Sequence, residues 1–143
     1  MKIKLLNSNY DENTGISNVT ILTEYGQFSG TSKLHEEDKH ISSSFAGCQY
    51  AEMKAIIKYM KYKVKIINER IKGLDNCRKT LENKKNYNHN SDENRTIRKQ
   101  IYILNKQKQE LKNKIFSLHD RMMRNIEQRE KIINKIKNKG DNV

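Results

Sequence analysis

The stretch that decides the fold runs from Tyr50 to Leu81 and reads YAEMKAIIKYMKYKVKIINERIKGLDNCRKTL. Within it, an apolar residue recurs every seven positions from Met53 to Leu81. A second series, starting at Tyr50 and continuing through Ile57, lies between the members of the first. Two interleaved series with this spacing are typical of a helix that packs in a coiled coil. The stretch therefore predicts one long helix with an apolar seam.

Residues 97–136 carry a matching pair of series, one starting at Ile97 and one at Ile101. The two seams fit each other in antiparallel register. Leu118 then lies opposite Ile57, and a segment rich in asparagine falls at the centre of the pairing. This arrangement predicts an antiparallel two-helix hairpin.

The expected organisation has two parts. Residues 1–46 form a small β head, and residues 47–143 form the helical hairpin. Helix one should cover about 48–83, the connection 84–91, and helix two about 92–139.

Local signals support these helix limits. Ser91 or Asp92 can cap helix two, because both side chains accept hydrogen bonds from the first free backbone N–H groups. Gly140 should stop that helix. Gly73 lies inside helix one at a cost of about 1 kcal/mol relative to alanine, and the heptads continue through it.

The first 46 residues show strand signals. Lys2–Leu6 alternates, residues 7–17 are polar and predict a loop, and Val19–Tyr25 is rich in β-branched side chains. Gln27–Leu34 alternates again. Gly30 within this last stretch indicates either a bulge or a close backbone approach.

Tyr25-Gly26 predicts a turn, because glycine accepts a positive φ. The fold class expected for the chain is therefore α+β: a small N-terminal antiparallel β head followed by a long antiparallel coiled-coil hairpin. Hydrophobic residues make up 34% of the chain, which is low for a globular protein. A thin hairpin of this kind buries little of itself, so we expect a homo-oligomer, a dimer or higher.

Charge is unevenly distributed along the chain. The formal net charge is +12, with −2 on residues 1–45 and +14 on residues 46–143. A basic helical half predicts an anionic partner. The richness in Lys, Asn and Ile is also what an AT-rich genome would impose, so codon bias is an alternative explanation. Arginine is less open to that explanation, and all of it lies in the basic half: Arg70, Arg78, Arg95, Arg98, Arg121, Arg124 and Arg129.

The sequence offers little for catalysis. No glycine-rich phosphate loop, nucleophile elbow or zinc pattern is present, and the histidines have no metal-ligand spacing. Cys48 and Cys77 form no Cys-x-x-Cys motif and predict reduced thiols. No apolar run is long enough to span a membrane, and the start is too quickly polar for a signal peptide. We expect a cytoplasmic protein that is not an enzyme and uses no metal or cofactor.

Two groups of residues are candidates for ligand binding. At the junction of head and helix, Tyr25, Phe28 and Tyr50 could stack a nucleobase while Arg121 and Arg124 hold phosphate. The alternative is that Tyr50 and Phe28 belong to the core and the arginines are solvated.

The second candidate is the tip of the hairpin, with Tyr87, Asn90, Arg95 and Arg98. Here the alternative is a solvated loop. Both groups match the chemistry of an anionic nucleotide.

A family resemblance adds a specific expectation. The residues that carry it are Glu24-Tyr25-Gly26-Gln27-Phe28-Ser29-Gly30, Lys33-Leu34-His35-Glu36-Glu37-Asp38, Gly47-Cys48 and Ala51-Glu52-Met53-Lys54-Ala55. With a β head before two long helices, the chain resembles the phage Thoeris anti-defence family of the first type. The resemblance covers residues 17–56 in motif and the rest only in layout.

The resemblance implies a non-enzymatic oligomer in the cytoplasm of an infected bacterium. Such a protein sequesters a cyclic ADP-ribose signal made by defence TIR enzymes, and in some members cyclic oligonucleotides. Two other classes stay open: a nucleic-acid binder that uses the basic helices, and a structural coiled-coil protein.

Overall fold

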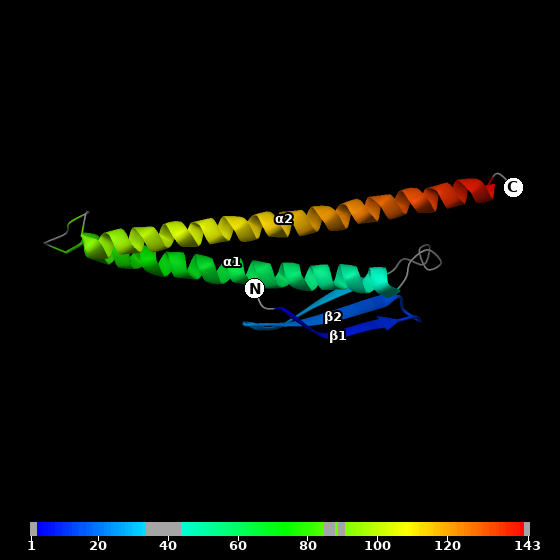
Figure 1. Ribbon diagram of the computed structural model, residues 1–143, viewed down its shortest axis with the longest axis horizontal. Helices are drawn as coiled ribbons and strands as arrows, with labels where there is room; N and C mark the ends of the chain where they lie inside the picture. The colour runs from blue at the N-terminus through cyan, green and yellow to red at the C-terminus, as the bar shows by residue number, and fades with distance from the viewer. Residues whose placement is uncertain (1–2, 34–43, 85–87, 89–90, 142–143) are drawn as a thin grey trace. The chain divides into compact units, whose positions relative to one another are not determined.

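The computed structural model describes residues 3–33, 44–84, 88 and 91–141. A three-stranded antiparallel sheet comes first and two long helices follow, so the predicted α+β class and element order are confirmed (Figure 1). The elements are β1 (Lys4–Asp11), β2 (Ile16–Thr23), β3 (Gly26–Lys33), α1 (Ser44–Glu82) and α2 (Asp92–Asp141).

Contacts within the chain divide it into two compact units. The first unit comprises Met1–Tyr59 and Phe116–Val143, and so contains the sheet, the beginning of α1 and the end of α2. The second unit, Met60–Ile115, contains the end of α1 and the beginning of α2.

The first strand is longer than predicted. β1 continues through Asn7 to Asp11, so the loop expected over residues 7–17 is shorter than the sequence suggested. Asn7 pairs with Thr20 and Asn9 with Asn18. These asparagines lie on the exposed outer strand of the sheet, where backbone pairing with β2 outweighs their low strand propensity.

Two tight connections join the strands. At the first, the Asp11 carboxylate accepts the backbone N–H of Asn13 at 2.9 Å, and Gly15 has a φ of 69°. At the second, the turn residues are Glu24 and Tyr25, one position earlier than predicted. Gly26 then opens β3 with a φ of 105°, a conformation that other residues rarely adopt.

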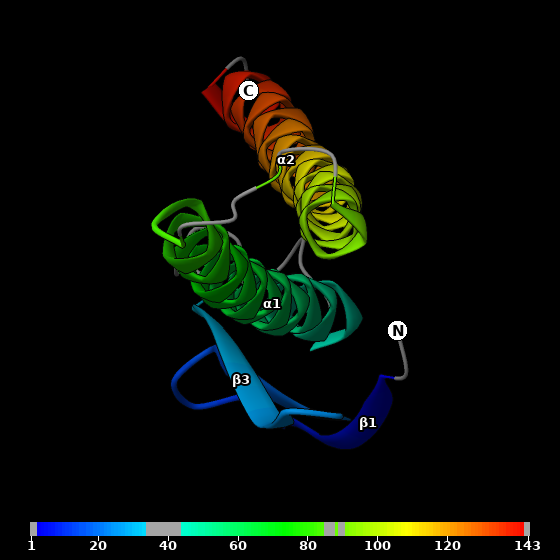
Figure 2. The same ribbon diagram turned by 90° about the vertical axis from the view of Figure 1, so that its left-hand side faces the viewer.

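The beginning of α1, up to Tyr59, lies over one face of the sheet, and glycines permit its close approach (Figure 2). A Cβ atom on Gly30 would overlap the carbonyl oxygen of Ala51 and lie 2.7 Å from the Ala55 nitrogen. A Cβ on Gly47 would likewise overlap the Ser17 hydroxyl. The close approach expected at Gly30 is therefore confirmed. The sheet's bulge lies elsewhere, at β1 between Leu5 and Asn7, whereas Gly30 pairs in register with Val19.

Packing between the sheet and α1 forms a small core centred on Tyr59, whose side chain is 0% exposed. The ring of Tyr59 lies 5.7 Å from that of Phe28 and 6.2 Å from that of Tyr25, in tilted geometries that favour aromatic pairs. Its hydroxyl donates a hydrogen bond to the Glu24 carboxylate at 2.6 Å. The completely or almost completely buried members of the core are Val19, Ile21, Ala51, Ala55 and Tyr59.

Burial, followed by the hydrogen bond to Glu24, raises the pKa of Tyr59 above the usual value of 10.0. Because the folded state holds the phenolic proton more tightly than the unfolded chain, this residue stabilises the fold fully below pH 10 and loses that contribution as pH rises further. Tyr59→Phe should cost about 1 kcal/mol at pH 8. We expect the difference in free energy of unfolding between wild type and Tyr59→Phe to become smaller above about pH 10. Urea unfolding monitored by circular dichroism measures it. If that difference stayed constant up to pH 11, Tyr59 would ionise as freely in the folded protein as in the unfolded chain.

Both helices extend beyond their predicted limits. α1 begins at Ser44, so Gly47 lies inside the helix and not before it. α2 runs through Gly140 to Asp141, so the prediction that Gly140 stops the helix is wrong. A glycine lowers helix stability by only about 1 kcal/mol, so a single glycine need not end a helix. The predicted cap at Ser91 is confirmed, because its hydroxyl accepts the N–H of Asn94 at 3.3 Å.

The predicted seams are visible in the burial of the helices. On α1, Met53, Met60 and Ile67 are at most 6% exposed. On α2, Leu111 and Met122 are buried, with 7% and 8% exposed. The pattern does not extend to Ile132, which is 48% exposed. Heptad spacing therefore predicts the buried face well as far as Met122.

Candidate functional site

The second unit contains a hollow between its two helices. Its volume is about 520 Å³, within the range of small-molecule sites. Its lining residues come from one turn of each helix: Arg70, Gly73, Leu74, Gln100, Ile103 and Leu104. Residues 70–74 thus face residues 100–104, which agrees with the antiparallel register predicted for the hairpin.

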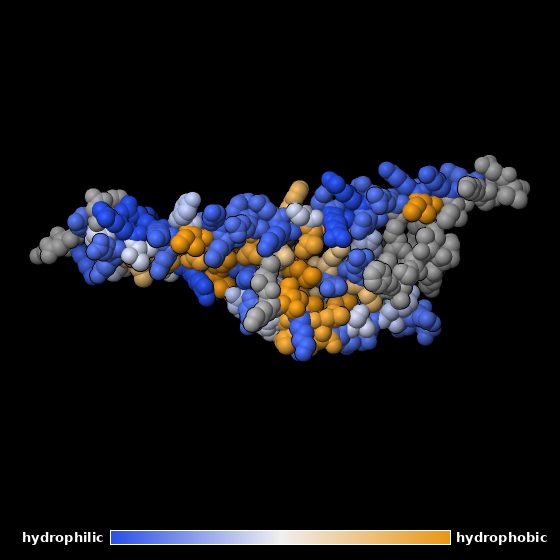
Figure 3. All heavy atoms as spheres, viewed as in Figure 1, coloured by the Kyte–Doolittle hydropathy of each residue, from blue (hydrophilic) through white to orange (hydrophobic). Residues whose placement is uncertain are grey.

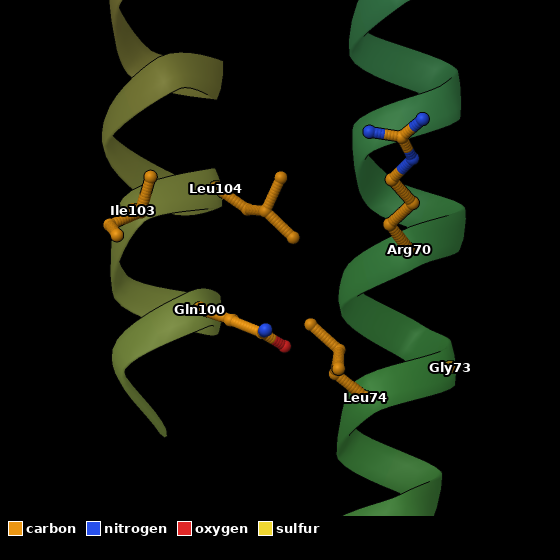
Figure 4. A pocket seen from close by; sticks show the side chains of 6 residues that line it. All are labelled: Arg70, Gly73, Leu74, Gln100, Ile103 and Leu104. Carbon is orange, nitrogen blue, oxygen red and sulfur yellow. The ribbon is translucent and has the colours of Figure 1, made fainter. Parts of the chain in front are cut away.

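Gly73 is an exposed residue that lines this hollow. A Cβ placed on it would meet no atom within 4 Å, so the absence of a side chain leaves open space beside α1. Leu104 and Gln100 point from α2 toward α1, and Leu74 points back toward them (Figure 4). The walls are therefore mainly aliphatic, as is common in small-molecule sites.

Two polar side chains accompany the aliphatic walls. Arg70 supplies a guanidinium group from α1, and Gln100 supplies an amide from α2 (Figure 4). A guanidinium group can stack on a base or bind phosphate through two parallel hydrogen bonds. An amide carries both donors and an acceptor, so it can read the polar edge of a base.

A second, shallower hollow of about 340 Å³ lies on α1 in the same unit. Three of its lining residues are lysines, Lys61, Lys65 and Lys72, and Glu69 is the one acid that lines it. Lys72 immediately precedes Gly73 in the chain. The same stretch of α1 therefore offers a mainly aliphatic hollow and a cationic one, which suits a ligand with a base and phosphates.

The residues predicted at the head lie in the first unit. Tyr25 and Phe28 are half-buried and pack against the core through Tyr59, as the alternative interpretation predicted for Phe28. Tyr50 is half-buried on α1. A role for these rings in binding ligand stays a prediction.

The predicted arginines of the first unit are solvent-exposed. Arg121 is exposed on α2, and Arg124 forms an ion pair with Asp120 at 3.0 Å while remaining 74% exposed. An exposed pair of this kind contributes little to stability. The arginines are thus accessible to an anion, and their role in binding stays a prediction.

The structure describes the tip only in part. Arg95 is exposed and Arg98 is half-buried near the start of α2. Tyr87 and Asn90 lie outside the described residues, as do Leu34 and the acidic stretch Glu36–Asp38. The tip site stays a prediction.

Sequence reasoning missed the hollow at Gly73. It treated that glycine as a tolerated interruption of a helix, although glycine in a helix interior often has a packing or functional reason. The available signal was its combination with Arg70 one turn earlier and with the apolar Ile103 and Leu104 opposite.

Metal sites and membrane-spanning helices are both absent from the described part of the chain. There, no cluster of three or more His, Cys, Asp or Glu side chains is arranged to hold a metal ion. In the same residues, no helix is long and apolar enough to cross a membrane. Comparison of the chain with known protein families, curated proteins and solved structures found no match.

Proposed function

We propose that this protein binds an anionic cyclic nucleotide of the cyclic ADP-ribose class and holds it without transforming it. The observation that carries the proposal is the hollow at Gly73, where aliphatic walls, one guanidinium group and one amide occur together. The base of the nucleotide occupies this hollow, beside Leu74 and Leu104.

The positive charge on α1 supports binding of the phosphate groups of this nucleotide. Lys61, Lys65 and Lys72 surround the shallower hollow on the same helix and can bind phosphate oxygens. Residues 46–143 carry a net +14, which attracts such an anion from a distance.

Sequestration follows from the kind of chemistry that the site offers. Arg70 and Gln100 are groups that hold and orient a ligand, and neither is a general base near neutral pH. The resemblance to the anti-defence family supports the same function: lowering the concentration of an immune signal by binding it.

Native mass spectrometry tests this function. We expect the protein to acquire the mass of a cyclic ADP-ribose isomer, and denaturation to release that molecule unchanged. The same experiment includes cyclic oligonucleotides and short duplex DNA. Hydrolysis products in the released fraction would contradict sequestration, and so would binding to DNA alone.

Nucleic-acid binding is the second candidate, and the lysine-lined hollow on α1 favours it. A protein that contacts several phosphates loses affinity steeply as salt rises. Duplex DNA should then bind with a steep salt dependence, and each lysine replacement should weaken binding slightly. A cyclic nucleotide held in the Gly73 hollow should show a much shallower dependence, because few ions are released.

A further inference from the structure

The outer edge of the sheet is open. β1 pairs with β2 along one side, and no strand within residues 3–33, 44–84, 88 and 91–141 pairs with its other side. An unpaired edge of eight residues offers a row of backbone donors and acceptors. Such an edge readily accepts another strand.

Apolar side chains gather where this edge begins. Leu5 is 53% exposed, Leu6 is 42% exposed, and their neighbours Ile3 and Leu22 are 37% and 38% exposed. Figure 3 shows the apolar patch on the sheet at the beginning of β1. A contiguous apolar patch beside an unpaired strand is typical of a protein–protein contact.

The pairing with β2 assigns each side chain of β1 to a face. Leu5, Ser8 and Tyr10 pair with Ile21, Val19 and Ser17, which are buried beneath α1. These three side chains of β1 therefore share the helix-covered face.

Lys4, Asn7, Asn9 and Asp11 lie on the opposite face. Leu6 is the extra residue at the bulge between Leu5 and Asn7. In any antiparallel pairing, directly opposed residues must lie on the same face.

A two-fold axis through Ser8 satisfies this condition for a second copy of the same strand. Asn7 then lies opposite Asn9 of the second copy. Because the bulge skips Leu6, Leu5 lies opposite Tyr10, and Lys4 lies opposite Asp11. Without the bulge, Lys4 would instead lie opposite Glu12, beyond the end of the strand.

The charges in this register are complementary. Lys4 and Asp11 take part in no ion pair within the described part of the chain. Asp11 accepts the N–H of Asn13 through one oxygen and keeps a second for a lysine. The symmetry forms the Lys4–Asp11 pair twice.

We propose that β1 is a homodimer interface, in which two copies pair antiparallel about Ser8 and complete a six-stranded sheet. The axis is perpendicular to the sheet, so the two α1 helices lie on the same face. The interface is separate from the Gly73 hollow, so it can be correct whether or not the proposed ligand binds.

Disulfide trapping tests the register. Ser8→Cys, in a chain whose free Cys48 and Cys77 are replaced by serine, brings two thiols into direct opposition across the axis. We expect nearly complete covalent dimer under mild oxidation. Asn9→Cys is the matched control, because its copies are offset along the strand and should remain monomeric on a non-reducing gel.

Charge reversal tests the interface in solution without a cross-link. Lys4→Glu and Asp11→Lys should each weaken the dimer about tenfold or more in sedimentation experiments, and the double variant should return to within about threefold of wild type. Lys33→Glu, an exposed lysine on the opposite edge, makes the same charge change and should leave the dimer unchanged. A monomeric wild-type protein would overturn the proposal. So would an oligomer that is indifferent to both single reversals, since it would use another surface, such as the exposed α2 residues Phe116 and Met123.

Discussion

Gly30→Val should destabilise the protein by about 3 kcal/mol or more, the largest stability loss that we expect from one substitution on the sheet. The added side chain would overlap the Ala51 carbonyl and press on the Ala55 nitrogen, both part of the α1 backbone. A backbone segment cannot rotate away as a side chain can, so the helix and sheet must separate. Valine's higher strand propensity offsets at most about 1 kcal/mol of that cost.

Urea unfolding monitored by circular dichroism measures this loss, and Gly73→Ala is the matched control. A Cβ at Gly73 meets no atom within 4 Å, so alanine there should stabilise the helix by about 0.5–1 kcal/mol. A loss of stability on substitution at Gly30 and a gain at Gly73 would show that helix–sheet contact determines the effect at Gly30. A Gly30→Val protein as stable as wild type would contradict the observed packing.

Gly73→Leu should weaken nucleotide binding by about 1–3 kcal/mol, roughly 5- to 150-fold, the usual cost of steric overpacking, because its side chain occupies the space assigned to the base. Leucine is a better helix former than glycine, and no neighbouring atom obstructs its Cβ. The variant should therefore be at least as stable as wild type, so a loss of binding could not be attributed to unfolding. Isothermal titration calorimetry with a cyclic ADP-ribose isomer measures the change.

Arginine variants locate the same site independently. Arg70→Ala should weaken binding by about 1.5–3 kcal/mol, the range for charge-assisted hydrogen bonds. Arg124→Ala makes the same chemical change in the other unit, where the side chain already pairs with Asp120. If the ligand instead bound at the site predicted at the head, Arg124→Ala would weaken binding more than Arg70→Ala. Loss of binding on substitution of Arg124, with no loss on substitution of Arg70 or Gly73, would favour the site at the head.

Much of the fold could be predicted from the sequence because long-range periodicity reports burial directly. The heptads through Met53, Met60 and Ile67 identified the buried face of α1, and Gly30 indicated a close approach that the contact with Ala51 confirms. Sequence reasoning missed a second row of buried residues on α1, spaced four apart: Ala51, Ala55 and Tyr59. This spacing overlaps the heptad pattern on the same helix. These three residues face the sheet and form the second buried face of α1.

Strand limits and helix ends were less predictable. β1 continues through Asn7 and Asn9 because pairing with β2 overrides their weak propensity, and that partner is not visible locally. α2 includes Gly140 and ends one residue later, at Asp141, because one glycine costs a helix only about 1 kcal/mol.

The candidate site was the least predictable feature. The hollow is lined by Gly73 and its neighbours on α1 together with residues of the opposing helix, about 30 positions away along the chain. Sequence reasoning instead chose aromatic and cationic side chains by type. Of these, Tyr25 and Phe28 pack against Tyr59, a contact that a list of residue types could not reveal.

An NMR titration of the ¹⁵N-labelled wild-type protein with a cyclic ADP-ribose isomer tests the central claim most directly, because it reports both binding and location. We predict saturable shift changes concentrated at Arg70, Gly73 and Gln100, with smaller changes at Lys65 and Lys72. Spectra that do not change on addition of the nucleotide, or changes confined to the Tyr25–Phe28 segment and Arg121, would contradict binding in the hollow at Gly73.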